Sequence, residues 1–69
     1  MSSLKLREEY IKLGQALKAA GLVGSGVEAK DVIADGLVKV NGETEYRRGR
    51  KLYGKDVVSF QGEEINIEN

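Results

Sequence analysis

The pattern of hydrophobic and polar positions first predicts a strand and then a helix. Residues 4–7 alternate apolar and basic side chains, and this period of two predicts a short edge strand. From residue 10 the pattern is helical, and Gly21 supplies the conformation that ends a helix, so a helix is predicted over 10–20. Gly14 lacks a Cβ and so allows another backbone to approach. Apolar residues at i, i+3, i+4 and i+7 form the buried face of this helix: Leu13, Ala16, Leu17 and Ala20.

A second helix is predicted after a short loop. Ser25 is followed three residues later by Glu28, which is a capping box: the hydroxyl accepts a backbone amide, and the carboxylate accepts one in return. The helix ends at Asp35-Gly36, and the two helices together are typical of a compact helix-turn-helix pair. Its core-facing residues are Ala29, Val32 and Ile33.

After residue 36 the period returns to two. Val38 and Val40 point to one side of a predicted strand over 37–40, and Lys39 points to the other. Asn41-Gly42 then supplies a residue pair that tolerates positive φ and turns the chain.

The remaining segments complete a small sheet. Strands are predicted over 56–60 and 65–67 with a turn at 61–64, while 47–55 has little periodicity and is expected to be mostly loop. The predicted fold class is α+β, with two packed helices against a small, mainly antiparallel bent sheet. We expect a single domain over 1–69.

The composition argues against catalysis. The chain has 69 residues and no Cys, His, Pro or Trp, so it lacks a thiolate and the commonest general base and metal ligand. Asp31 and Asp35 lie one turn apart on a helix face and are typical of solvated charge, while Ser25 and Ser59 have no histidine to activate them. We therefore expect a binding module without enzyme activity, cofactor or metal.

The chain carries no targeting signal that we can identify. No apolar run approaches a membrane span, and the first residues lack the hydrophobic segment of a signal peptide. A chain of this size without disulfides is expected in the cytoplasm. No membrane partner and no small-molecule substrate are expected.

The charges are unevenly distributed although 11 basic and 11 acidic residues cancel. Residues 1–29 hold four bases and three acids, residues 30–55 hold seven and four, and residues 56–69 hold four acids and no base. Five bases fall within nine residues with no acid among them: Arg47, Arg48, Arg50, Lys51 and Lys55.

Two near-matches to nucleotide-binding motifs fail on their context. Residues 49–55 read G-x-x-x-x-G-K, but Asp56 stands where Ser or Thr must hold magnesium, and a strand follows instead of a helix. Residues 24–29 fit G-x-G-x-x-A, yet a predicted helix precedes them where a strand is required.

The basic cluster favours polyanion binding over a merely solvated loop. Arginine donates two parallel hydrogen bonds to phosphate and can stack on an exposed base. Tyr46 and Tyr53 bracket the cluster and either stack on bases or anchor the loop. The candidate residues are Arg47, Arg48, Arg50 and Lys51 on the loop, Lys30 on the second helix and Lys39 on the following strand.

The residues from Ser25 to Gly42, followed by Gly54 to Val58, resemble the RNA-binding domain named after small-subunit ribosomal protein S-four. The small stand-alone bacterial members of the YbcJ and YaaA kind share the SGVEAK helix start, the GLVKVNGE strand and turn, and the RRGRKL basic loop. The resemblance covers residues 9–67.

This resemblance implies a fold in which two helices, the alpha-L motif, pack across a bent sheet. It implies RNA binding by the second helix, where Ser25, Gly26 and Lys30 match the helix start, and by the basic loop. Gly26 and Lys30 stand where larger members commonly carry arginines, so more of the binding falls to residues 47–51. The implied partner is ribosomal or transfer RNA, or a ribosomal particle, in ribosome assembly or translation.

Two other functions remain open at the level of the sequence. The basic loop could dock on an acidic partner protein, with the acidic C-terminal segment mimicking that partner and holding the loop in check. A module that binds small phosphates or nucleotides is the third possibility.

Overall fold

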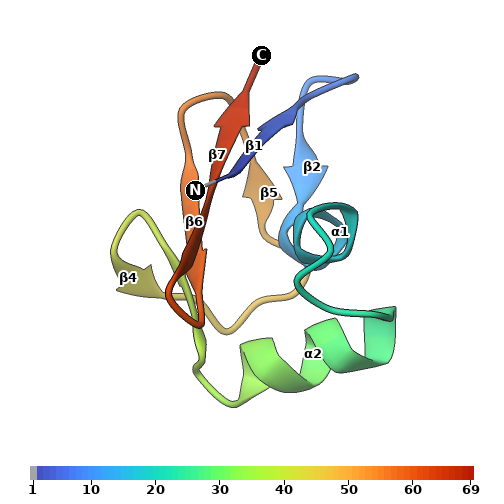
Figure 1. The fold of residues 1–69 in the computed structure, drawn as a ribbon, viewed down its shortest axis with the longest axis vertical. Coiled ribbons are helices and arrows are strands. Elements are labelled where there is room, and N and C mark those ends of the chain that lie inside the picture. Colours follow the sequence, from blue (N-terminus) through green and yellow to red (C-terminus); the bar gives the residue numbers. More distant parts are fainter. Residues whose placement is uncertain (1) are drawn as a thin grey trace.

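The computed structural model describes residues 2–69, which form two helices beside two small sheets (Figure 1). The helices are α1 (Leu13–Ala19) and α2 (Gly26–Ala34). The strands are β1 (Ser2–Lys5), β2 (Ile11–Lys12), β3 (Val38–Val40), β4 (Glu43–Thr44), β5 (Lys51–Leu52), β6 (Val57–Phe60) and β7 (Glu63–Glu68).

The larger sheet has the strand order β1-β7-β6-β3-β4. Its pairs are antiparallel except for β1 and β7, which are parallel, so the predicted mainly antiparallel sheet is confirmed. β1 lies at one edge of this sheet, as the alternation over 4–7 predicts, although the strand begins two residues earlier. β2 and β5 form a separate antiparallel ribbon beside α1.

The core lies between the helices and one face of the larger sheet. The period-two prediction holds in β3, where Val38 and Val40 are buried and Lys39 is exposed. The predicted apolar stripes of both helices also contribute to the core, except that Ala20 and Val32 are only partly buried. The members of the core are Leu13, Ala16, Leu17, Val23, Ala29, Ile33, Val38, Val40, Leu52, Val58, Phe60, Ile65 and Ile67.

The first helix starts at Leu13, so the predicted start at residue 10 is wrong. Ile11 and Lys12 pair with Leu52 and Lys51 and form β2 instead. The first amides of α1 then find partners outside the helix. The N–H of Leu13 donates to the carbonyl of Arg50 at 2.8 Å, and that of Gly14 donates to the carbonyl of Arg48 at 3.1 Å.

The predicted cap of α2 forms with one change. Ser25 Oγ accepts the N–H of Glu28 at 3.1 Å, as a capping box requires. The Glu28 carboxylate accepts the N–H of Gly24 at 2.7 Å, one residue before the amide that the motif names. Gly36 follows the helix with a φ of +77°, in the left-handed conformation expected after a helix.

Two tight turns connect the antiparallel strands. Asn41 and Gly42 both have positive φ, 53° and 86°, as the sequence predicts. Gln61 and Gly62 repeat this geometry with φ of 53° and 80°, so β7 begins at Glu63 and is longer than predicted. Over residues 2–69, no helix has the length and apolar character that crossing a membrane requires.

Candidate nucleic-acid interface

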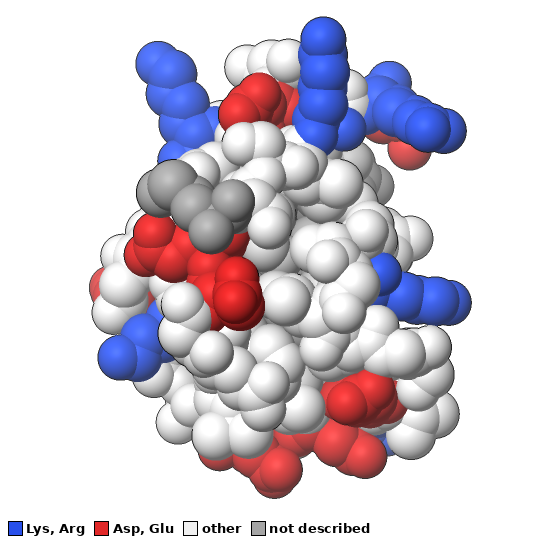
Figure 2. Space-filling model, viewed as in Figure 1, with Lys and Arg blue, Asp and Glu red and all other residues white. Residues whose placement is uncertain are grey.

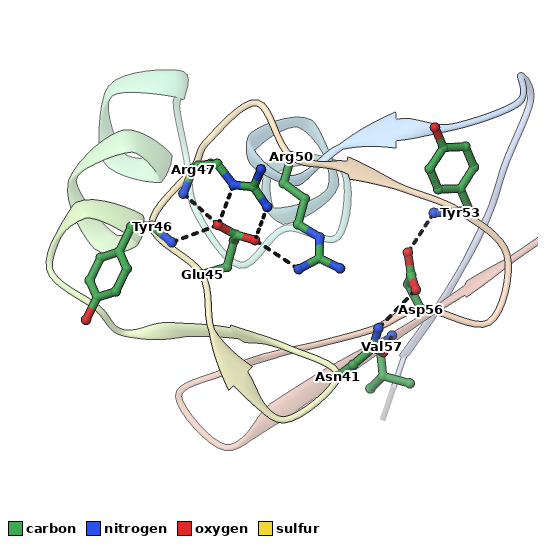
Figure 3. Close-up of polar contacts among 8 residues, drawn as sticks. All are labelled: Asn41, Glu45, Tyr46, Arg47, Arg50, Tyr53, Asp56 and Val57. Atoms are coloured by element: carbon green, nitrogen blue, oxygen red, sulfur yellow. Dashed lines mark hydrogen bonds and ion pairs between the residues drawn. The ribbon is translucent and has the colours of Figure 1, made fainter.

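The segment that connects β4 to β5 is organised around a buried acid, Glu45. This residue is only 7% exposed, and its carboxylate accepts five hydrogen bonds (Figure 3). Oε2 accepts the backbone N–H groups of Tyr46 and Arg47, both at 3.1 Å, and Arg47 Nε at 3.0 Å. Oε1 accepts Arg47 Nη2 at 3.1 Å and Arg50 Nη1 at 2.9 Å.

These contacts keep Glu45 ionised. The side-chain hydrogen bonds from Arg47 lower the pKa of Glu45 to about 2; burial acts in the opposite direction, and Arg50 adds to the lowering. The same contact raises the pKa of Arg47. Two arginines of the basic cluster are therefore held by an acid. The charges counted over 47–55 do not include this acid, because Glu45 lies just before that run.

A hollow of about 350 Å³ lies between α1, α2 and residues 47–51, which we call the basic segment. Arg48 and Gly49 close it on the side of the basic segment. Arg48 reaches this position because Gly14 lacks a Cβ: a Cβ there would lie 2.8 Å from Arg48 Cγ. The sequence predicts that another backbone approaches Gly14; the nearest atoms instead belong to the Arg48 side chain, while the Arg48 carbonyl oxygen lies 3.7 Å from the same Cβ position. The remaining lining residues are Lys12, Gly14, Gln15, Lys18, Gly26 and Ala29.

A second hollow, of about 560 Å³, adjoins the first one and shares Gly49 with it. No acidic side chain lines either hollow. Six of the 11 bases of the chain therefore border one continuous surface, although the net charge is zero. These six are Lys12, Lys18 and Arg48 around the first hollow and Arg47, Arg50 and Lys51 around the second.

Other parts of the surface are mixed in charge. On the face shown in Figure 2, acidic side chains gather along the lower edge, where Figure 1 shows α2, and left of the centre. Basic side chains extend from the upper edge, where acidic ones lie among them, and beside α1. The absence of acids around the two hollows is thus a local property of that surface.

The structure brings most of the sequence-predicted residues together. Gly26 lines the first hollow, and Lys30 is exposed one turn further along α2. Ser25 lies beside Gly26, but its hydroxyl is occupied by the cap of α2. Lys39 is not brought to this surface, because it points away from the core on the outer face of β3, beside Ser59.

Sequence reasoning did not select Lys12 and Lys18, which both line the first hollow. They lie outside the basic run, and they reach the hollow only because α1 packs beside α2 and residues 48–49. Both lysines lie within the predicted helix over 10–20, and two bases six residues apart in a helix are too common to single them out.

The two tyrosines that bracket the basic cluster occupy different surroundings. Tyr46 is 65% exposed, and its ring lies against Gly36 at the end of α2. Tyr53 is 44% exposed and packs against Tyr10, with ring centroids 6.1 Å apart. Figure 3 shows the two rings on opposite sides of the Glu45 cluster, which consists of Glu45, Arg47 and Arg50.

The acid that forms ion pairs with the basic loop is Glu45, which is not in the C-terminal segment. Asp56 accepts the side-chain amide of Asn41 at 3.0 Å and the N–H of Tyr53 at 2.8 Å. Within residues 2–69, the ion pairs of the basic loop go to Glu45. Within the described residues, the acidic segment 56–69 thus contacts the loop through the backbone N–H of Tyr53 and forms no ion pair with its basic side chains.

The S4 domain family model matches residues 4–68 of the chain. Among curated proteins, "Probable ribosome maturation protein RlbA" of Bacillus subtilis (strain 168) is 46% identical over 59 residues, which cover 86% of this chain and 83% of that protein. YbcJ of Escherichia coli (strain K12) is 36% identical over 61 residues, covering 88% of this chain and 87% of that protein.

Solved structures give the same result. The solution structure of YbcJ from E. coli, described as revealing an αL motif involved in RNA binding, matches with a TM-score of 0.77 and 34% identity over 100% of this chain and 89% of that chain. The 30S ribosomal protein S4e of Thermoplasma acidophilum matches with a TM-score of 0.63 and 26% identity, over 84% of this chain and 31% of that one. The chain belongs to the S4 domain family.

Proposed function

We propose that the chain is an RNA-binding module that holds structured ribosomal or transfer RNA during ribosome assembly or translation, in the cytoplasm. The observation that carries the proposal is the arrangement of six basic side chains around two adjoining hollows without a lining acid. A chain with no net charge has no general attraction for RNA, so binding requires such a local concentration of positive charge.

The first hollow has the parts that a phosphate contact needs. Lys18 and Arg48 provide charge from α1 and from the basic segment, and Gly26 exposes the backbone at the start of α2. Free amides at a helix start attract phosphate, and the absence of a side chain at Gly26 lets RNA approach them. Arg48 offers a guanidinium that can donate two parallel hydrogen bonds.

Glu45 gives the second hollow a fixed geometry. Because its carboxylate holds both Arg47 and Arg50, the two guanidinium groups keep their relative positions before RNA binds. Arg47 remains 74% exposed in this arrangement and presents its other nitrogen to solvent. Ordering the arginines in advance lowers the entropy cost of contacting RNA.

The relatives favour structured RNA as the partner. RlbA carries a ribosome maturation name, YbcJ has an αL motif that is described as involved in RNA binding, and S4e is a ribosomal protein. A small module recognises structured RNA mostly through its shape, phosphates and 2′-hydroxyl groups. The chain therefore acts by binding, and the proposal assigns it no catalytic step.

The test is a titration of a labelled ribosomal RNA stem-loop at several salt concentrations. The logarithm of the affinity falls with the logarithm of the salt concentration by about 0.7–0.9 per phosphate contact. For the wild type we expect a slope that corresponds to three or more phosphate contacts. For the double variant Lys18→Gln/Arg48→Gln, the slope should correspond to about two contacts fewer.

The matched control is Lys5→Gln/Lys39→Gln, which removes the same charge from β1 and from the outer face of β3, and neither residue lines either hollow. We expect this variant to bind as the wild type does. Equal losses in both double variants would mean that net charge alone governs binding, and no binding by the wild type would overturn the proposal. A cellular partner that survives RNase treatment would instead indicate docking on a protein.

A further inference from the structure

The β2–β5 ribbon presents two lysines and two tyrosines on its outer side. Its register pairs Ile11 with Leu52 and Lys12 with Lys51. Leu52 is fully buried and Ile11 packs against the core, so Lys12 and Lys51, the next pair, point to the opposite side of the ribbon.

The aromatic pair follows directly along the two strands. Tyr10 precedes Ile11 and Tyr53 follows Leu52, and their ring centroids lie 6.1 Å apart with an interplanar angle of 53°. Tyr10 is half-buried beneath Lys51, whose Nζ lies 4.8 Å from the centroid of the ring. Tyr53 is the more exposed of the two rings, with 44% of its surface accessible.

The two lysines form a cross-strand pair of like charge. Residues directly opposite in an antiparallel pair have Cβ atoms about 4.5–5.5 Å apart, and like charges there are destabilising. Within residues 2–69, the ion pairs join Glu45 to Arg47 and Arg50, and none of them involves Lys12 or Lys51. A bound anion between the lysines would turn this repulsion into attraction.

The ribbon is continuous with the proposed RNA surface. Lys12 lines the first hollow and Lys51 lines the second, so a strand of RNA that crosses both hollows passes over the lysine pair. The tyrosines stand one residue further along. A nucleotide whose phosphate lies between the lysines thus has its base within reach of the exposed Tyr53 ring.

We propose that this ribbon is a subsite for an unpaired nucleotide, whose phosphate is held by Lys12 and Lys51 and whose base stacks on Tyr53. The inference rests on the proposed function and narrows its ligand to RNA in which a helix is followed by unpaired residues. A base inside a continuous helix is already stacked between its neighbours, so an exposed tyrosine can only receive a base that is unpaired.

The experiment compares one RNA stem-loop with a blunt end with the same stem-loop carrying three unpaired nucleotides, placed on the 5′ end in one RNA and on the 3′ end in another. We expect one of the two extensions to raise the affinity of the wild type on the order of tenfold, the scale of one stacked base. Tyr53→Leu should lose this gain and still bind the blunt stem-loop as the wild type does.

Tyr46→Leu is the matched control, because it removes a tyrosine that is 65% exposed, against 44% for Tyr53, from the other side of the Glu45 cluster. It should keep the gain, and so should Tyr53→Phe, which retains the stacking ring. In a parallel pair, Lys51→Gln should reduce the gain while Lys39→Gln, on the outer face of β3, leaves it unchanged. Thermal unfolding of every variant verifies that the fold is intact.

A direct readout places the fluorescent base 2-aminopurine at the first unpaired position. Its emission should fall when the wild type binds and stay constant with Tyr53→Leu, because stacking on the ring quenches it. If the blunt and extended RNAs bind the wild type equally, the subsite is overturned while the proposed function stands. If neither RNA binds, the proposed function itself fails.

Discussion

The guanidinium group of Arg47 meets the carboxylate of Glu45 at two points, Nε to Oε2 at 3.0 Å and Nη2 to Oε1 at 3.1 Å. Arg50 completes the cluster from the other side at 2.9 Å. Glu45 is buried beneath a segment that would otherwise consist of exposed positive charges, so the acid offsets their mutual repulsion. Arg47 and Arg50 consequently contribute to stability as well as to the proposed RNA surface, whereas Arg48 lines the first hollow without a hydrogen bond to Glu45.

Glu45 is expected to make the stability of the protein depend on pH in the acid range. Its pKa of about 2 in the folded state is below the ordinary value of 4.5, so the unfolded chain binds the proton more readily. The stabilisation is fully present above about pH 4.5 and is lost as the pH falls through about 2. At neutral pH, Glu45→Gln should lower the free energy of unfolding by about 1–3 kcal/mol.

Urea unfolding of the wild type and Glu45→Gln between pH 7 and pH 2 measures this dependence. The difference in stability between the two proteins should shrink over the acid window. A difference that stays constant down to pH 2 would show that the Glu45 carboxylate contributes through packing and not through its charge.

Substitution of Arg50 is expected to lower the stability of the protein, and substitution of Arg48 its affinity for RNA. The Arg50 side chain is 31% exposed and donates to Glu45, so Arg50→Gln should lower the stability by about 1–2 kcal/mol. For a domain of this size that corresponds to a fall in Tm of about 4–8 °C per kcal/mol. Arg48 is exposed at the first hollow, so Arg48→Gln should keep the Tm and lose RNA affinity. Thermal unfolding and RNA titration of both variants test this division, and the reverse pattern would refute it.

At Gly49, a charge of either sign can be added to the proposed RNA surface without disturbing the fold. A Cβ at this position would meet no atom within 4 Å, and both hollows include the residue. We expect Gly49→Glu to weaken RNA binding roughly tenfold, or about 1.4 kcal/mol, and Gly49→Lys to strengthen it. The two variants should have the same Tm. Equal effects of both side chains on affinity would mean that bulk, and not charge, matters at this position.

Asn41 is expected to stabilise the turn through its side chain as well as its backbone. Its Nδ2 donates to Asp56 at 3.0 Å, its Oδ1 accepts the N–H of Val57 at 2.9 Å, and its φ is 53°. Asn41→Gly keeps the conformational freedom and loses both hydrogen bonds, for a cost of about 1–2 kcal/mol. Asn41→Ala loses the hydrogen bonds and also strains the backbone, so urea unfolding should rank it as the less stable variant.

Local patterns predicted most of the fold because the relevant interactions are local. The stripe that contains Leu13 and Leu17, the Ser25 cap and the Asn41-Gly42 turn each depend on residues a few positions apart, and all three form. The exceptions are the two-residue strands β2, β4 and β5, which the patterns did not predict; β5 lies within residues 47–55, which were expected to be mostly loop. Ile11 continues a helical pattern, and only its pairing with Leu52, 41 residues away, makes it a strand.

The site was less accessible to sequence reasoning. Basic residues in a sequence do not show which way their side chains point. Lys39 was therefore grouped with the loop, although the alternation around it already placed its side chain opposite to those of Val38 and Val40. Lys18 reaches the first hollow through helix packing, and Glu45 acts from a buried position by holding two arginines. Neither effect has a sequence pattern of its own.

The carbonyl groups of Arg48 and Arg50 accept the first two amides of α1, and so the basic segment serves as the N-terminal cap of a helix that lies more than 30 residues earlier in the chain. Substitution and insertion consequently have separate effects in this segment. The Arg48 side chain can be exchanged to suit another RNA without loss of the cap, because the cap uses backbone carbonyls. The length of the segment cannot change between Arg48 and Arg50, because an added residue would move one carbonyl away from its amide.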